Sequence, residues 1–174
     1  FPLNTGFPQV GAINTGMFGN MTFDTPIRYT KSLEPTLGFV DQYEVSPDLT
    51  TVTMRLRPDL SFPDGSKVTP QDVFFNIDLI REPAKFGVTG AFQLAAFATS
   101  FKDLKAVDDR TMVFTLDKPR PNINDFFAQL RVTKAATYDK LKTGEQILGT
   151  GPYWASSFRQ GVGFEAVPNP KYYQ

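Results

Sequence analysis

A turn followed at once by a helix start is the feature that most constrains this chain of 174 residues. Residues 63–65 are Pro-Asp-Gly, in which proline presets φ and glycine accepts a positive φ, so the chain reverses there. Thr69 then offers its hydroxyl as an N-cap, Pro70 suits the first helical position, and Asp72 lies near the positive helix end. The sequence therefore predicts a reversal and then a helix that begins at Pro70.

The predicted helix runs from Pro70 to Arg81, because Pro83 prevents much continuation. Its apolar residues follow the i, i+3, i+4, i+7 spacing of a single helix face, and they are Val73, Phe74, Ile77 and Ile80. We expect this face to pack against a core.

Strands are predicted where apolar and polar residues alternate. Residues 51–57 alternate over their whole length, which indicates a half-buried strand. Two hairpins are expected, one formed by 104–107 with 111–116 and the other by 153–158 with 164–167. These segments predict an antiparallel contribution to the fold.

The remaining segments carry weaker patterns. Residues 1–36 are rich in Gly, Asn, Thr and Pro, and we expect loop around one short helix within 13–23 that breaks near Gly16 and Gly19. Two further short helices are predicted, at residues 122–130 and 138–142.

Composition narrows the classes of function. Lys and Arg number 18, as do Asp and Glu, so the formal charge is zero and nucleic acid is not expected as a partner. The chain has no Cys and no His, which removes thiolate chemistry, Cys-based zinc sites and the commonest general base. Carboxylate chemistry and oxygen-ligand Ca²⁺ or Mg²⁺ sites remain possible. No stretch of the sequence is apolar enough to span a membrane.

Several aspartates are candidates for paired catalytic carboxylates, but their positions match turns and a helix start, where Asp serves the backbone. They are Asp48, Asp64, Asp72, Asp108 and Asp109. Residues 149–151, Gly-Thr-Gly, do not complete a phosphate-binding pattern, and we interpret them as a backbone turn.

Three segments, in this order, resemble one family. Residues 43–48 (Tyr-Glu-Val-Ser-Pro-Asp) lead into a strand that ends Leu56-Arg57, and residues 62–73 are similar to the pattern F-x-D-G-x-x-V-T-A-x-D-V. Residues 149–153 (Gly-Thr-Gly-Pro-Tyr) and 168–173 (Pro-Asn-Pro-Lys-Tyr-Tyr) resemble "G-T-G-P-Y" and "R-N-P-x-Y-W". The family is that of the extracellular solute-binding proteins of ABC importers, in its dipeptide- and oligopeptide-binding cluster (family 5).

The resemblance implies an α/β fold with a mixed sheet, of the periplasmic-binding-protein-like type II. Members are two-lobed receptors without catalysis that close on a ligand between the lobes. We expect this chain to be a fragment that covers the first lobe, with residues 1–30 in lobe I, 31–146 in the extra subdomain of the peptide-binding cluster, and 147–174 returning to lobe I. The second lobe is expected to lie outside this chain, so that binding by one wall is weak.

The resemblance also implies where the ligand lies. The loop ahead of the segment that resembles "y-e-g-L", here Phe23–Ile27, faces the ligand in the family. An aromatic residue after the first long helix often does so too. The corresponding candidates are Gly11, Ala12, Ile13, Asn14, Phe86 and Phe92.

The leading hypothesis is therefore a solute-binding component of an ABC import system. Peptide or another small solute and the membrane permease subunits are its expected partners, and no cofactor, metal or catalytic residue is expected. The resemblance implies a periplasmic or extracellular location, and a monomer is expected. Two alternatives stay open, a carboxylate-based hydrolase resembling a glycosidase and an ectodomain of the receptor fold that docks a protein. Two carboxyl groups across a closed cleft would favour the first, and a large exposed apolar patch the second.

Overall fold

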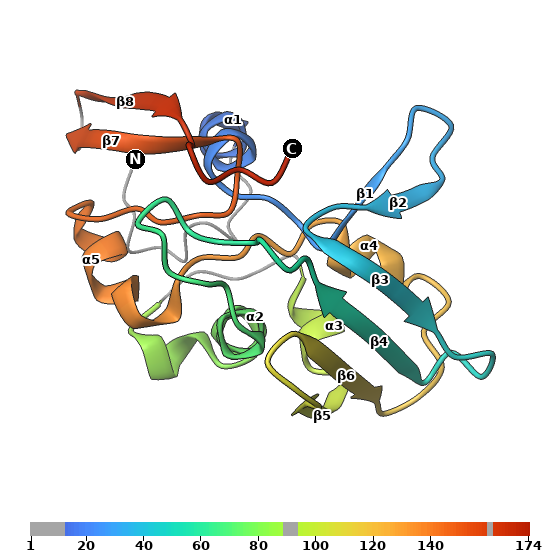
Figure 1. Ribbon diagram of the computed structural model, residues 1–174. Coiled ribbons are helices and arrows are strands. Elements are labelled where there is room, and N and C mark those ends of the chain that lie inside the picture. Colours follow the sequence, from blue (N-terminus) through green and yellow to red (C-terminus); the bar gives the residue numbers. More distant parts are fainter. Residues whose placement is uncertain (1–12, 89–93, 160–161) are drawn as a thin grey trace.

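The largest sheet has four antiparallel strands in the order β3-β4-β6-β5 (Figure 1). The computed structural model describes residues 13–88, 94–159 and 162–174. The four strands are β3 (Val40–Val45), β4 (Thr51–Leu56), β5 (Phe101–Ala106) and β6 (Thr111–Leu116). The predicted strand at 51–57 and the first predicted hairpin are confirmed, and Asp108 closes that hairpin by accepting the backbone N–H groups of Arg110 and Thr111.

Alternation along the two central strands buries one face of this sheet. Val52 pairs with Phe114 and Met54 with Met112, and none of these four side chains is exposed. Helix α4 (Ile123–Phe127) covers the face with Phe126 and Phe127. Aromatic rings thus fill the core, which accounts for the high phenylalanine content of the chain.

Helix α2 (Pro70–Arg81) has the predicted bounds. Gly65 has a φ of 83°, as the turn requires, and Val73, Ile77 and Ile80 are buried. Thr69 is the N-cap, as predicted, and it forms a capping box with Asp72, whose carboxylate accepts the Thr69 N–H at 3.0 Å and the Thr69 hydroxyl at 2.8 Å.

The same Asp72 carboxylate accepts the N–H of Ala135 at 3.0 Å, so it joins α2 to a distant segment. That segment leads through a 3₁₀ turn, η3 (Ala135–Thr137), into α5 (Tyr138–Thr143), which begins at the predicted residue and is followed by Gly144 with a left-handed φ of 77°. A second 3₁₀ turn, η2 (Pro83–Phe86), follows α2. Helix α3 (Ala95–Ala98) precedes β5, which is an edge strand of the four-stranded sheet.

The first and last parts of the chain lie side by side (Figure 1). Helix α1 (Ile13–Thr22) packs beside the hairpin of β7 (Tyr153–Arg159) and β8 (Gly163–Pro168), as the contact between the Phe18 and Phe164 rings at 4.3 Å shows. The second predicted hairpin is therefore confirmed. No helix in the described ranges is long and apolar enough to cross a membrane.

Three expectations were wrong in detail. Helix α1 continues through Gly16 and Gly19 without a break, and Gly19 allows the Arg131 guanidinium to approach within 3.2 Å of the place a Cβ would occupy. The helix expected at 122–130 is shorter, since α4 ends at Phe127 and the chain continues as a turn, in which the Leu130 N–H still donates to the Phe126 oxygen. Residues 27–37 are not loop, since β1 (Ile27–Tyr29) pairs with β2 (Pro35–Leu37) as a projecting two-stranded ribbon (Figure 1).

We expect Asp72→Asn to lower the free energy of unfolding by roughly 1 to 3 kcal/mol, because one acceptor oxygen replaces a carboxylate that is 7% exposed and serves three donors. Urea unfolding measures the change. Asp103→Asn, on the exposed edge strand β5, makes the same chemical change as a control and should alter stability by less than about 0.5 kcal/mol. Equal effects of the two variants would contradict the bridging role of Asp72.

Candidate functional site

The residues predicted to face a ligand are only partly within the described ranges. Gly11, Ala12 and Phe92 lie outside them, whereas Ile13 and Asn14 form the first turn of α1. The structure therefore brings two of the six candidates together at one helix end. What fixes the position of α1 fixes the position of this part of the predicted ligand wall.

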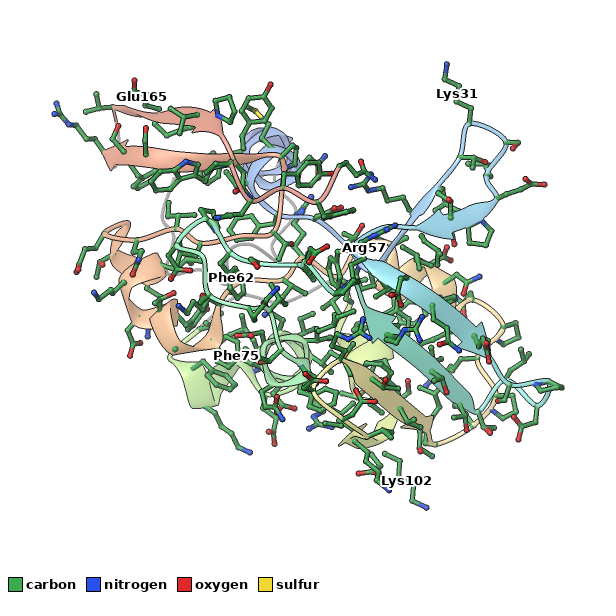
Figure 2. The ribbon with its side chains drawn as sticks, in the orientation of Figure 1. Lys31, Arg57, Phe62, Phe75, Lys102 and Glu165 are labelled. Carbon is green, nitrogen blue, oxygen red and sulfur yellow. The ribbon has the colours of Figure 1, made fainter. Side chains whose placement is uncertain are left out.

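Phe86 lies elsewhere, at the end of the 3₁₀ turn that follows α2. Its ring packs edge-to-face on Phe75, with centroids 5.2 Å apart, and on Tyr138 at 6.5 Å. Phe75 lies on the α2 side of the molecule (Figure 2). The ring of Phe86 is thus held in a cluster between α2 and α5, and its role as a ligand contact stays a prediction.

The C-terminal end of α1 packs directly against residues 149–151, which we call the glycine corner. A Cβ on Gly149 would lie 2.0 Å from the carbonyl oxygen of Thr22, and one on Gly151 would lie 2.6 Å from that of Met21. The two backbones can meet only because neither glycine carries a side chain. The Gly151 N–H donates to the Thr22 oxygen at 3.0 Å, which locks the contact.

A side chain of the glycine corner also accepts a hydrogen bond from the segment after α1. The hydroxyl of Thr150, which is 1% exposed, accepts the backbone N–H of Asp24 at 3.2 Å. Asn169 holds the corner from the other side, since its amide donates to the Gly151 oxygen at 2.9 Å and its backbone N–H to the Pro152 oxygen at 2.8 Å. The two segments that resemble "G-T-G-P-Y" and "R-N-P-x-Y-W" therefore serve as structural supports for α1.

A polar cluster, defined as Asp24, Arg28, Tyr172 and Tyr173, joins the segment after α1 to the end of the chain. Arg28 binds both carboxylate oxygens of Asp24 through Nε and Nη2, and Nη2 also donates to the hydroxyls of Tyr172 and Tyr173. The Tyr173 hydroxyl donates to Asp24 Oδ2 at 2.6 Å. The guanidinium of Arg57 lies 4.8 Å from the Tyr173 ring centroid, as a cation–π contact.

Two members of this cluster, Arg28 and Tyr173, have raised pKa values and stay protonated near neutral pH. Burial, followed by the charge of Asp24, raises the pKa of Tyr173 well above its ordinary value. Burial acts to lower the pKa of Arg28, but its bonds to Asp24 outweigh that effect and raise the pKa overall. Arg28 and Tyr173 are therefore structural supports and are not suited to proton transfer at pH 7.

A hollow of about 250 Å³ lies beside the cluster. Its lining residues are Asn20, Phe23, Asp24, Thr25, Arg28 and Ala128. The two charged side chains are already paired with each other, so the hollow offers a solute mainly neutral polar groups and apolar surface. A second hollow, of about 330 Å³, lies between the β1–β2 ribbon and β3 and has a largely apolar lining that includes Leu37 and Tyr43.

Four of the five aspartates considered for catalysis, Asp48, Asp64, Asp72 and Asp108, have structural partners. The hydroxyls of Ser46 and Thr50 lower the pKa of Asp48, and the N–H groups of Arg110 and Thr111 lower that of Asp108. Carboxyls with lowered pKa values are poor general acids at neutral pH.

The other two aspartates with a described role belong to the segment 62–73. Burial acts to raise the pKa of Asp64, but the bonds from Lys134 and Ser66 outweigh it, so its pKa is lowered. Asp64 meets Lys134 at 2.7 Å, and Asp72 binds Ala135, so both tie this segment to residues 134–135. Among the described residues, no group of three His, Cys, Asp or Glu side chains is placed to hold a metal ion.

Comparison with known proteins identifies a family. The family model for bacterial extracellular solute-binding proteins, family 5, matches residues 34–174. A protein of Brucella ovis, named as a candidate ABC transporter peptide-binding protein, is 27% identical over 161 residues, which cover 86% of this chain and 29% of the relative. The chain thus spans less than a third of the length of this curated relative.

Solved structures share the fold over almost the whole chain. AgaA of A. tumefaciens R10, in complex with agropinic acid, has a TM-score of 0.83 at 22% identity, with 99% of this chain and 34% of that chain covered. OppA of Haemophilus influenzae, in complex with the peptide RPPGFSPFR, has a TM-score of 0.80 at 17% identity, with 99% and 37% covered. At these identities the likeness establishes the type II binding-protein fold and no ligand.

Replacing Gly149 by alanine should lower the free energy of unfolding by about 2 kcal/mol or more, because its Cβ would overlap the Thr22 carbonyl oxygen and the Phe23 ring. Gly163→Ala is the matched control, since a Cβ there meets nothing within 4 Å, and its effect should stay below about 1 kcal/mol. Urea unfolding of both variants measures the difference. Two equally stable variants would contradict the close contact at the corner.

The polar cluster predicts an alkaline loss of stability. An unfolded tyrosine ionises near pH 10, whereas folding keeps Tyr173 protonated, so above that pH the unfolded state binds fewer protons. The free energy of unfolding should therefore fall as the pH rises above 10, by up to about 1.4 kcal/mol per pH unit for this side chain. Unfolding of Tyr173→Phe measured from pH 7 to 11 should show a weaker dependence than the parent chain, and parallel curves would contradict the assignment.

Proposed function

Because the chain belongs to the bacterial extracellular solute-binding proteins, family 5, we propose that it forms the first lobe of a receptor that delivers a solute to an ABC importer. The observation that carries this proposal is the family match over residues 34–174, joined to a type II binding-protein fold that covers the chain. The receptor holds its solute on a wall that includes the start of α1.

Peptide is the solute class that we propose. The Brucella ovis relative is named for peptide binding, and it is more similar to this chain than the solved structures are. The fold alone does not select the ligand, since one solved structure is bound to agropinic acid and another to a peptide. Selectivity in such receptors lies in a few cleft side chains.

We also propose the division of the chain that the resemblance implied. Residues 31–146 contain the four-stranded sheet and the helices around it, and residues 147–174 bring the chain back to α1. Two contacts support this return of the chain to α1. Gly151 of the glycine corner donates to the Thr22 oxygen, and Tyr173 donates to Asp24, which lies 149 positions earlier in the sequence. In this proposal residues 1–30 and 147–174 build lobe I, and 31–146 are its extra subdomain.

The receptor acts without catalysis in this proposal. Solute-binding proteins hold and release a ligand, and four of the five aspartates singled out by the sequence serve turns, caps and ion pairs here. The lowered pKa values of Asp48, Asp64 and Asp108 disfavour the general acid that a carboxylate-based hydrolase needs. We propose permease subunits as the membrane partner and a location outside the cytoplasm, in keeping with the family.

Calorimetric titration with pools of short peptides, sugars and metal chelates tests the proposal. The chain alone should bind peptides with a Kd of about 1 mM or weaker, because one wall buries only part of a ligand. The protein that carries this chain at the length of its relatives should bind peptides at least about tenfold more tightly. Turnover of any pool, or tight binding of sugars or chelates with none of peptides, would contradict the peptide receptor.

Asn14→Ala tests the wall itself. It should weaken peptide binding by the longer protein, since Asn14 lies in the first turn of α1, where the resemblance places the ligand. Gln42→Ala, on β3, removes an amide of similar chemistry and should leave the affinity unchanged. If both variants bind as the parent does, this part of α1 is not in the wall.

A further inference from the structure

Three cations from separate elements border a small hollow beside the end of β4. Arg57 follows β4, Lys67 lies in the loop before α2, and Arg110 comes from the β5–β6 turn. The hollow has a volume of about 150 Å³, and its apolar lining includes Leu60 and Val68, which are 2% and 4% exposed. We call it the cation hollow.

Backbone carbonyl groups orient the three cations. Arg57 donates through Nε to the Gly38 oxygen at 2.9 Å, Lys67 through Nζ to the Pro58 oxygen at 3.0 Å, and Arg110 through Nη1 to the Leu56 oxygen at 3.1 Å. Arg57 is fixed further by the ring of Tyr173. Each cation is therefore oriented by a neutral acceptor, which does not itself compensate the positive charge.

Carboxylates near the hollow do not balance this charge. Among the described residues, neither Arg57 nor Lys67 takes part in an ion pair. Arg110 reaches Asp41 at 3.6 Å, but Asp41 is also bound by Arg55 at 2.6 Å. Asp109 is the one acidic residue in the lining that the structure describes, and it is exposed to solvent.

We propose that the cation hollow binds a small oxyanion, a carboxylate or phosphate group. The planar guanidinium groups suit paired oxygens, and the apolar lining lowers the local dielectric constant, which strengthens the attraction. A volume of about 150 Å³ equals roughly five water molecules, so the hollow takes one such group and not a whole peptide. The site stands on residues 57–69 and 109–110 and does not depend on the proposed solute wall.

The test is a nuclear magnetic resonance titration of the whole chain at pH 7 and constant ionic strength, with inorganic phosphate in one arm and acetate in the other. Saturating shifts of the Leu60 and Val68 amides in either arm would support the site, and the arm that saturates at lower concentration identifies phosphate or carboxylate as the preferred group. Shifts that do not saturate, or that chloride reproduces at equal concentration, would overturn the proposal.

Matched variants locate the binding. Lys67→Gln removes a charge whose one described hydrogen bond is to Pro58, so the fold should survive, and affinity should fall about fivefold. Lys102→Gln makes the same change at the outer edge of the sheet, far from Arg57 (Figure 2), and should leave affinity unchanged. Equal losses in the two variants would overturn the site in favour of general attraction.

A second pair of variants tests whether positive charge at the cation hollow drives binding, without removing a cation. Asp109→Asn should tighten oxyanion binding about threefold, because it deletes the acidic group in the lining. Asp103→Asn alters the net charge equally from the edge strand β5 and should have no such effect. A gain that is the same in both variants, or absent in both, would contradict the proposal.

Discussion

The arrangement of this chain depends on one backbone contact, in which residues 149–151 lie directly against the end of α1. Any side chain at Gly149 would overlap the Thr22 carbonyl oxygen, so the approach is available only to glycine. The contact joins segments more than 120 residues apart, and from it follow the position of the β7–β8 hairpin beside Phe18 and the placement of Tyr173 on Asp24. This contact also fixes the direction of helix α1, whose first turn contains Ile13 and Asn14.

The segments that mark the family are supports of the fold. Residues 62–73 fix α2 and tie it to residues 134–135 through Asp64 and Asp72, while Asn169 holds the glycine corner. Arg57 stacks on Tyr173, so the end of the strand in the first motif meets the end of the last one. Similar folds hold a peptide in one solved structure and agropinic acid in another, so the fold alone does not select the solute.

Local chemistry made much of the fold predictable, and long-range contacts limited the rest. Helix α2 and both hairpins carry their own turn and spacing signals, and their bounds in the structure agree closely with the expectation. The β1–β2 ribbon has three-residue strands with no usable periodicity, and Leu33 in its turn takes a left-handed φ of 63° that sequence does not foretell. The guanidinium of Arg131 lies against Gly19 of α1, and the polar cluster joins residues 24 and 173, so neither contact has a local signal. Of the predicted ligand contacts, Ile13 and Asn14 share one helix turn, whereas Phe86 packs among Phe75 and Tyr138.

Hydrogen exchange of individual backbone amides in the native chain tests most directly whether the glycine corner supports the fold of this chain. The amides of Gly151 and Asp24 donate across the corner, and the amide of Asn169 donates to Pro152 beside it. If the corner is the common support, these three amides should exchange only through global unfolding, with the same opening free energy as the amides of the β4–β6 pair. Exchange at the corner through a separate opening of much lower free energy, while the β4–β6 pair stays protected, would contradict the account.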